Sequence, residues 1–194
     1  HTAWINVPYT AEFFCANKTL DMDDTDKLSL LFAACQRAGL QMEPPDVNRG
    51  IYRFEPVSDK VIRYGLGAIK GSGQQAIEAI VAAREDGPFT SLFDFCRRVD
   101  RSRLNKRTVE ALIKAGAFDA IELNRAALLA SLEQAFDFAA ARVANANQGG
   151  LFDMMDEGPG ASHEEPALAD VVPWGVKERL TFEKTAIGFY LSGH

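Results

Sequence analysis

The stretch Ile62-Arg-Tyr-Gly-Leu-Gly-Ala-Ile-Lys-Gly-Ser-Gly-Gln-Gln-Ala-Ile-Glu-Ala-Ile80 decides how this chain is built. It predicts a short apolar helical turn, a tight turn at Gly71-Ser72-Gly73, and a helix with apolar residues on one face. Two glycines around one small residue allow positive φ angles and a close approach of two backbones. We therefore expect a helix-hairpin-helix unit.

This turn has the features of a phosphate site. The first turn of the following helix leaves backbone N–H groups without partners, and its partial positive charge favours an anion. Such a site would hold a nucleic-acid backbone without reading bases. An ordinary loop is the alternative. A dinucleotide-binding loop is set aside, because Ala76 stands where its third glycine is needed. The predicted contacts are Lys70, Gly71, Ser72, Gly73, Gln74 and Gln75.

A second pair of helices follows directly. Thr90 or Ser91 is a predicted cap for a helix over 92–99, and Asn105 for a helix that ends at Lys114. The basic turn between them lacks Gly-x-Gly, so we expect it to reach DNA with side chains. Two packed helices with ordinary surface arginines are the alternative. The predicted contacts are Arg101, Arg103, Asn105, Lys106 and Arg107.

Charge is distributed unevenly along the chain. The net charge is −6, yet residues 60–115 hold 11 Lys and Arg against 6 Asp and Glu. A basic island of this kind is expected where a polyanion binds. Residues 153–170 hold 6 Asp and Glu and no Lys or Arg, and their Gly, Pro and Ser content predicts a flexible linker.

The remaining patterns predict a mostly α fold with a small β-hairpin, in which a tandem helix-hairpin-helix domain is flanked by helical segments. The hairpin strands are expected at 51–54 and 61–64, joined through 58–60. Further helices are expected at 8–20, 25–38, 124–144 and 174–191. The helix over 124–144 would bury a stripe formed by Leu129, Leu132, Phe136, Ala140 and Val143.

Five regions follow from these elements. A helical region (1–43) precedes the β-hairpin and tandem helix-hairpin-helix domain (44–119). A long helix (120–147) comes next, then a partner-binding motif with the acidic linker (148–173), and a last helix (174–194) that leads onward.

Composition excludes several classes of protein. The chain is 47% apolar, which suffices for a core, but no apolar run approaches the roughly 20 residues of a membrane span. Cys15, Cys35 and Cys96 are far apart, as expected for reduced thiols in a cytoplasmic protein and not for a disulfide framework or zinc site. Because the chain begins at His1 without Met, we expect it to be part of a longer protein.

Leu151-Phe152 is a pair of large apolar residues at the edge of the acidic linker. Such pairs dock into a partner's pocket as short linear motifs. The alternative is that the pair folds back onto the core of its own domain.

Several segments, in this order, resemble the alpha subunits of bacterial DNA polymerase III, the C family of replicative polymerases. They are Tyr64–Gly73, Leu104–Arg107 with Gly116–Asp119, and Glu183–His194. Upstream, Ala11–Phe14, Asp21–Thr25 and Pro44–Asn48 resemble the end of the fingers region of that family.

The resemblance implies that the tandem hairpins grip the duplex that leaves the polymerase active site. It also implies that the sliding clamp and other polymerase subunits are partners, and that the Mg²⁺-binding catalytic aspartates lie outside this chain. No catalytic residue, metal or cofactor is then expected here, and the chain alone should be inactive. The implied clamp-binding motif is Gln148, Gly149, Gly150, Leu151 and Phe152.

Other functions fit the same hairpins. A stand-alone DNA-binding adaptor or repair-factor module would share them, as would an error-prone second copy of the polymerase. A hairpin-containing glycosylase would need a catalytic Asp and Lys at a fixed distance from the hairpin, and the sequence has no convincing set.

Overall fold

The computed structural model describes residues 10–18, 24–147 and 165–188. Its helices are α2 (Ala11–Lys18), α3 (Thr25–Arg37), α4 (Gln74–Ala83), α5 (Leu92–Arg98), α6 (Lys106–Lys114), α7 (Arg125–Ala130), α8 (Leu132–Asn147) and α10 (Val176–Ile187). Its strands are β1 (Gln41–Glu43), β2 (Glu55–Ser58) and β3 (Val61–Arg63), and its 3-10 turns are η2 (Leu66–Ala68) and η3 (Arg84–Asp86). The prediction of a mostly α fold with a small sheet is confirmed.

The sheet has the order β1-β3-β2, with β1 parallel and β2 antiparallel to β3. The predicted hairpin is therefore present, but the prediction of its first strand at 51–54 was wrong. The carbonyl groups of Ile51 and Tyr52 accept hydrogen bonds from the N–H groups of Leu66 (2.8 Å) and Gly67 (2.9 Å). This segment thus supports η2, and strand pairing begins only at Glu55.

Two aromatic clusters pack in separate parts of the molecule. Near the sheet, the rings of Phe14 and Tyr64 lie 5.9 and 5.0 Å from that of Phe54, edge to face. Around α5, the ring of Phe95 lies 4.9 Å from those of Phe89 and Phe118. Edge-to-face contacts of this kind add about 1 kcal/mol each to the burial of the rings.

One predicted helix is two helices in the structure. The expected helix over 124–144 is broken at Ser131, which is 1% exposed and whose Oγ accepts a hydrogen bond from the Ala169 N–H (2.8 Å). The predicted buried stripe was also wrong at its end, since Val143 is 41% exposed. The stripe that the structure buries is Leu128, Leu132, Ala135 and Ala139.

Residues 165–171 lie on the helices instead of forming a free linker. The Glu165 carboxylate accepts a hydrogen bond from the Ser91 hydroxyl (2.7 Å), and the Val171 carbonyl accepts one from the Asn124 amide (2.8 Å). The other part of the predicted linker, 153–164, lies outside the described residues. The sequence did not predict these contacts of 165–171 with Ser91 and Asn124.

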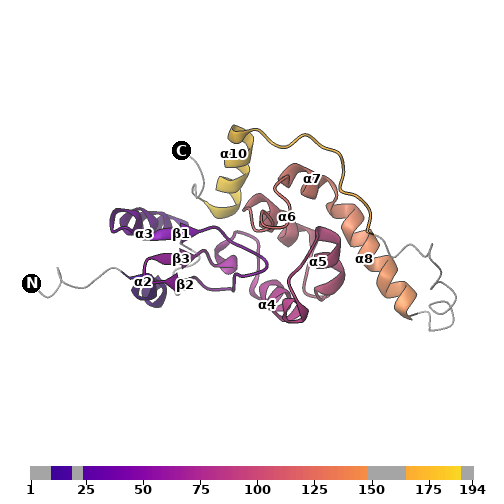
Figure 1. The fold of residues 1–194 in the computed structure, drawn as a ribbon, viewed down its shortest axis with the longest axis horizontal. Helices are drawn as coiled ribbons and strands as arrows, with labels where there is room; N and C mark the ends of the chain where they lie inside the picture. Colours follow the sequence, from indigo (N-terminus) through magenta and orange to yellow (C-terminus); the bar gives the residue numbers. More distant parts are fainter. Residues whose placement is uncertain (1–9, 19–23, 148–164, 189–194) are drawn as a thin grey trace, which may run out of the picture.

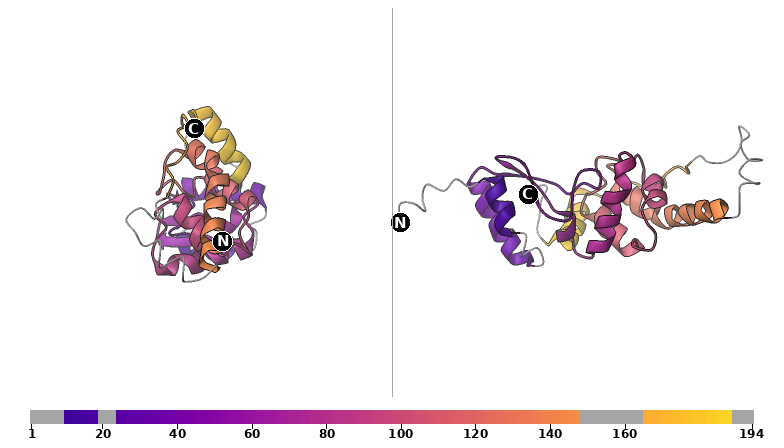
Figure 2. Two further views of the ribbon diagram at one scale, coloured as in Figure 1. Left: turned by 90° about the vertical axis from the view of Figure 1, so that its right-hand side faces the viewer. Right: turned by 90° about the horizontal axis from the view of Figure 1, so that it is seen from below.

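The two ends of the molecule contain different secondary-structure elements (Figure 1). The sheet lies with α2 and α3 at one end, and α8 lies at the other, as the elongated view in Figure 2 also shows. The last helix, α10, returns to pack on α6, and its Ala186 carbonyl accepts a hydrogen bond from the Lys70 N–H (2.8 Å). No described helix has the length and apolar character needed to cross a membrane.

Candidate nucleic-acid interface

The first turn, which we define as Lys70–Gly73, has the expected backbone. Gly71 has φ +87° and Gly73 has φ +74°, so the prediction that both adopt positive φ is confirmed. Gly73 is the N-cap of α4, and neither a side-chain cap nor an acidic first-turn residue is present. Among the described residues, none accepts a hydrogen bond from the N–H groups of Gly73, Gln74 or Gln75. These donors are available to an anion.

Ser72 has a structural place in this turn. It is 2% exposed, and its hydroxyl donates to the Ile69 carbonyl (2.8 Å). The Gly71 carbonyl in turn accepts from the Thr108 hydroxyl on α6 (3.2 Å). The Ser72 hydroxyl, which the sequence analysis placed in the site, therefore faces the protein, and the turn is fastened to α6.

The second turn, which we define as Asp100–Asn105, pairs part of its donors with its own side chains. The Asn105 side chain caps α6 by accepting from the Thr108 N–H (2.8 Å). The Asp100 carboxylate accepts from the Ser102 N–H (3.0 Å) and hydroxyl (2.8 Å), and these bonds lower the pKa of Asp100. Among the described residues, none accepts a hydrogen bond from the N–H groups of Asn105, Lys106 or Arg107, so this turn also offers main-chain donors to a phosphate.

The side chains of Arg101, Arg103, Lys106 and Arg107 are all exposed. The Arg103 Nε lies 3.8 Å from an Asp100 oxygen, and the Lys106 Nζ lies 3.8 Å from a Glu133 oxygen. Exposed pairs at such distances contribute at most about 1 kcal/mol, so a polyanion can displace them.

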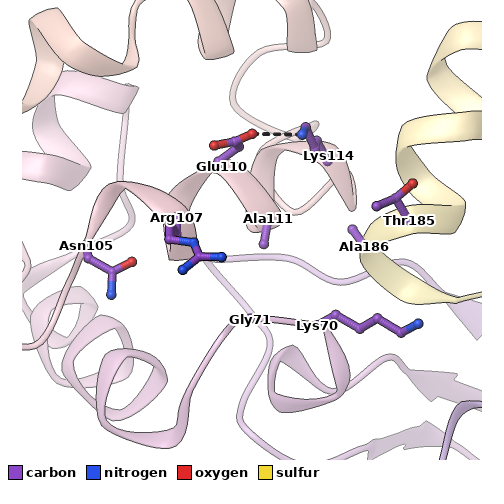
Figure 3. A pocket seen from close by; sticks show the side chains of 9 residues that line it. All are labelled: Lys70, Gly71, Asn105, Arg107, Glu110, Ala111, Lys114, Thr185 and Ala186. Carbon is purple, nitrogen blue, oxygen red and sulfur yellow. Dashed lines mark hydrogen bonds and ion pairs between the residues drawn. The ribbon is translucent and has the colours of Figure 1, made fainter.

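A cavity of about 590 Å³ joins the two turns (Figure 3). We call it the α10 cavity; its lining is Lys70, Gly71, Asn105, Arg107, Glu110, Ala111, Lys114, Thr185 and Ala186. A second cavity, of about 230 Å³, lies on the other side of the first turn and is lined by all of Lys70–Gly73. The structure therefore brings Asn105 and Arg107 together with Lys70, whereas Arg101, Arg103 and Lys106 line neither cavity.

Sequence reasoning missed how α10 is fixed beside this site. The buried Arg125 guanidinium donates to both Asp119 oxygens (2.9 and 2.6 Å) and lies 3.4 Å from the buried Glu183 carboxylate on α10. Burial alone would lower the pKa of Arg125, but the hydrogen bonds to Asp119 and the charge of Glu183 raise it. The 58 positions between Arg125 and Glu183 leave no local signal of this pair.

The predicted clamp-binding residues, Gln148, Gly149, Gly150, Leu151 and Phe152, lie outside the described residues. The three cysteines, Cys15, Cys35 and Cys96, are buried and form no disulfide. Burial raises the pKa of Cys15 to about 11 and that of Cys96 to about 12.

Comparison with known proteins identifies the family. Residues 39–128 match the family described as the helix-hairpin-helix motif. Over its whole length the chain is 51% identical to DNA polymerase III subunit alpha of Neisseria meningitidis serogroup B. It is 44% identical to that of Vibrio cholerae and 42% identical to that of Escherichia coli K12. The chain spans 17% of the length of these curated relatives. Together these matches show that the chain belongs to the DNA polymerase III subunit alpha family, as a segment that carries a helix-hairpin-helix motif.

Proposed function

We propose that this chain is a non-catalytic segment of a bacterial replicative DNA polymerase that grips the backbone of duplex DNA. The observation that carries the proposal is the first turn, where the unpaired N–H groups of Gly73, Gln74 and Gln75 begin α4 beside the exposed Lys70. Backbone donors at a helix N-terminus suit a phosphate and carry no preference for a base.

Such a grip suits an enzyme that moves along any sequence. Contacts to phosphates release counterions, so binding is sequence-independent and weakens steeply with salt. Exposed arginines of the second turn, Arg101 and Arg103, would add charge without adding specificity. The duplex would be the product of synthesis carried out by parts of the polymerase outside this chain.

We also propose that Gln148–Phe152 binds the sliding clamp. Leu151 and Phe152 supply an apolar anchor, and the Gln148 amide can both donate and accept hydrogen bonds. Gly149 and Gly150 lose more conformational entropy on binding than other residues would, which weakens the motif. Simultaneous DNA and clamp contacts offset this weakness through effective concentration.

Further partners and a cellular compartment are also proposed for this segment. Other subunits of the replicative polymerase are proposed as further partners, and the cytoplasm as the compartment. Reduced thiols persist there, in keeping with the buried cysteines Cys15, Cys35 and Cys96, which form no disulfide.

A glycine substitution tests the DNA grip. Gly73→Val places a β-branched residue at φ +74°, a conformation such residues avoid, and so reshapes the turn. We expect its affinity for a blunt DNA duplex to fall more than tenfold at low salt. Gly87→Val is the matched control, because Gly87 also has positive φ and open space but lines neither cavity. Equal losses in both variants, or no loss in either, would contradict the proposal.

Clamp binding is tested by pull-down with the purified sliding clamp. Replacing Leu151 and Phe152 by Ala should abolish capture and leave helix content unchanged. Replacing the neighbouring pair Met154 and Met155 by Ala is the control and should leave capture intact. Capture of the first variant would place the clamp motif elsewhere in the polymerase.

A further inference from the structure

We propose that the α10 cavity binds a sugar-phosphate segment of the duplex, with Lys70 and Arg107 as its cationic ligands and α10 as its wall. This inference rests on the proposed function and deepens it. It adds a helix from outside both hairpins to the DNA interface, and it gives the two turns one shared phosphate site.

The cationic side chains of the cavity come from different elements. Lys70 belongs to the first turn and Arg107 to the first helical turn of α6, and Figure 3 shows Arg107 directed toward the Gly71 backbone. Among the described residues no carboxylate pairs with Lys70 or Arg107. The other charges of the lining neutralise each other, since the Lys114 ammonium lies 2.8 Å from Glu110. The cavity therefore carries an uncompensated positive charge.

Size and lining favour a nucleic-acid backbone as the ligand. About 590 Å³ falls within the range of sites that hold molecules much larger than a single ion. Among the described residues that line it, none is an aromatic residue on which a base could stack, whereas Asn105, Arg107 and Lys70 suit a polar, anionic chain. Arg107 presents a planar fork that matches phosphate oxygens, and Lys70 adds a mobile point charge.

The wall formed by α10 is fixed in three ways. Its Ala186 carbonyl accepts the Lys70 N–H (2.8 Å), so the helix ends on the first turn itself. Its Glu183 pairs with the buried Arg125. Its Phe182 ring lies 5.0 Å from the Lys114 ammonium, a cation–π contact that also orients Lys114. A ligand in the cavity would thus touch a surface that is already rigid.

Two threonines on α10 provide a matched test. Thr181 and Thr185 are both exposed, and each hydroxyl donates to the carbonyl four residues earlier, at 2.9 and 3.0 Å. Only Thr185 lines the cavity. Thr185→Trp would place an indole ring in part of the cavity without changing any charge, whereas Thr181→Trp adds the same bulk one turn away.

We expect Thr185→Trp to weaken binding of the chain to a blunt DNA duplex about tenfold and Thr181→Trp to leave it unchanged. Arg107→Gln should lower the slope of log affinity against log salt by about 1. Because that variant leaves the cavity open and α10 untouched, it tests the site even if the Trp variant shifts α10.

The outcomes separate this inference from the proposed function. If Gly73→Val weakens binding while Thr185→Trp and Arg107→Gln do not, the cavity site is overturned and the first-turn grip stands. If Thr185→Trp and Arg107→Gln weaken binding while Gly73→Val does not, the cavity site stands and the first-turn grip falls. If none of the three weakens binding, both are overturned.

Discussion

Each turn of the tandem unit connects two helices, but the first uses glycines without a side-chain cap and the second uses side-chain hydrogen bonds. The first turn uses glycines at φ +87° and +74° and leaves the start of α4 uncapped. The second turn places Asn105 on the Thr108 N–H and Asp100 on the Ser102 N–H, so its own side chains satisfy two of its donors. A duplex would therefore meet unpaired main-chain donors at the start of both helices, with a side-chain cap at α6 alone.

A helix N-terminus that is capped from within the chain has fewer main-chain donors to offer an anion. Both α4 and α6 begin with the same geometry of free N–H groups. At α6 an internal amide accepts one of them, which stabilises the helix at the expense of an external ligand. Four experiments test how the two turns and their surroundings differ.

Arg125→Ala tests how far the first turn depends on α10. Removing this guanidinium leaves the buried Glu183 carboxylate without it, which should lower the free energy of unfolding by about 3–5 kcal/mol. Arg97→Ala is the control, since Arg97 is 42% exposed in its pair with Asp94 and should cost at most about 1 kcal/mol. Urea denaturation measures both. Equal costs would mean that the Arg125 network does not hold α10.

Charge removal at the second turn tests its mode of binding. The double variant Arg101→Gln/Arg103→Gln should lose about tenfold in duplex affinity at low salt, and its salt slope should fall by about 2. The double variant Arg37→Gln/Lys177→Gln removes two exposed charges elsewhere and should leave the slope unchanged. Fluorescence anisotropy over a salt series gives both slopes. An unchanged slope in the first variant would limit DNA contact to the first turn.

The capping contrast predicts a smaller effect on stability. Asn105→Ala removes the cap of α6 and should lower the free energy of unfolding by about 1 kcal/mol. Gln75→Ala, in the first turn of the uncapped α4, should have almost no effect on stability. Thermal unfolding compares the two variants. A comparable loss in Gln75→Ala would show that α4 is capped after all.

The smallest effect concerns acid pH. Burial alone would raise the pKa of Asp94, but hydrogen bonds from the Thr90 N–H and the Arg98 guanidinium hold it below 3.8. A lowered folded-state pKa stabilises the fold above 3.8, and this stability is lost as the pH falls toward the folded-state value. Unfolding free energy should therefore fall less steeply on acidification in Asp94→Asn than in the unmodified chain. If urea denaturation gave the same dependence of unfolding free energy on pH for both proteins, Asp94 would not contribute to stability in this way.

The sequence predicted what is locally encoded. Positive φ at Gly71 and Gly73, and the cap by Asn105, depend on residues within one turn of each other, so their patterns are readable. The start of α3 was predicted for the same reason, since Asp24 accepts from the Lys27 N–H.

The structural features that the sequence did not predict depend on contacts between residues that are far apart in the chain. Strand β1 has only three residues and exists because β3 offers it a parallel edge. The break at Ser131 reflects a hydrogen bond from Ala169, and the α10 wall depends on a pair between Arg125 and Glu183. None of these contacts produces a hydrophobic periodicity or a recognisable motif in the sequence.

The attachment of residues 165–171 has a mechanical consequence. The connection that carries the proposed clamp motif leaves the domain at Asn147, the last residue of α8, and rejoins it where Glu165 meets Ser91 on α5. The described residues on either side of 148–164 therefore both belong to the helical body. A force applied by a partner bound to the proposed motif would act on α8 at one end and on the hydrogen bonds at Ser91, Ser131 and Asn124 at the other. Because α5 and α8 pack on each other, both ends transmit this force to the same body that carries the second turn.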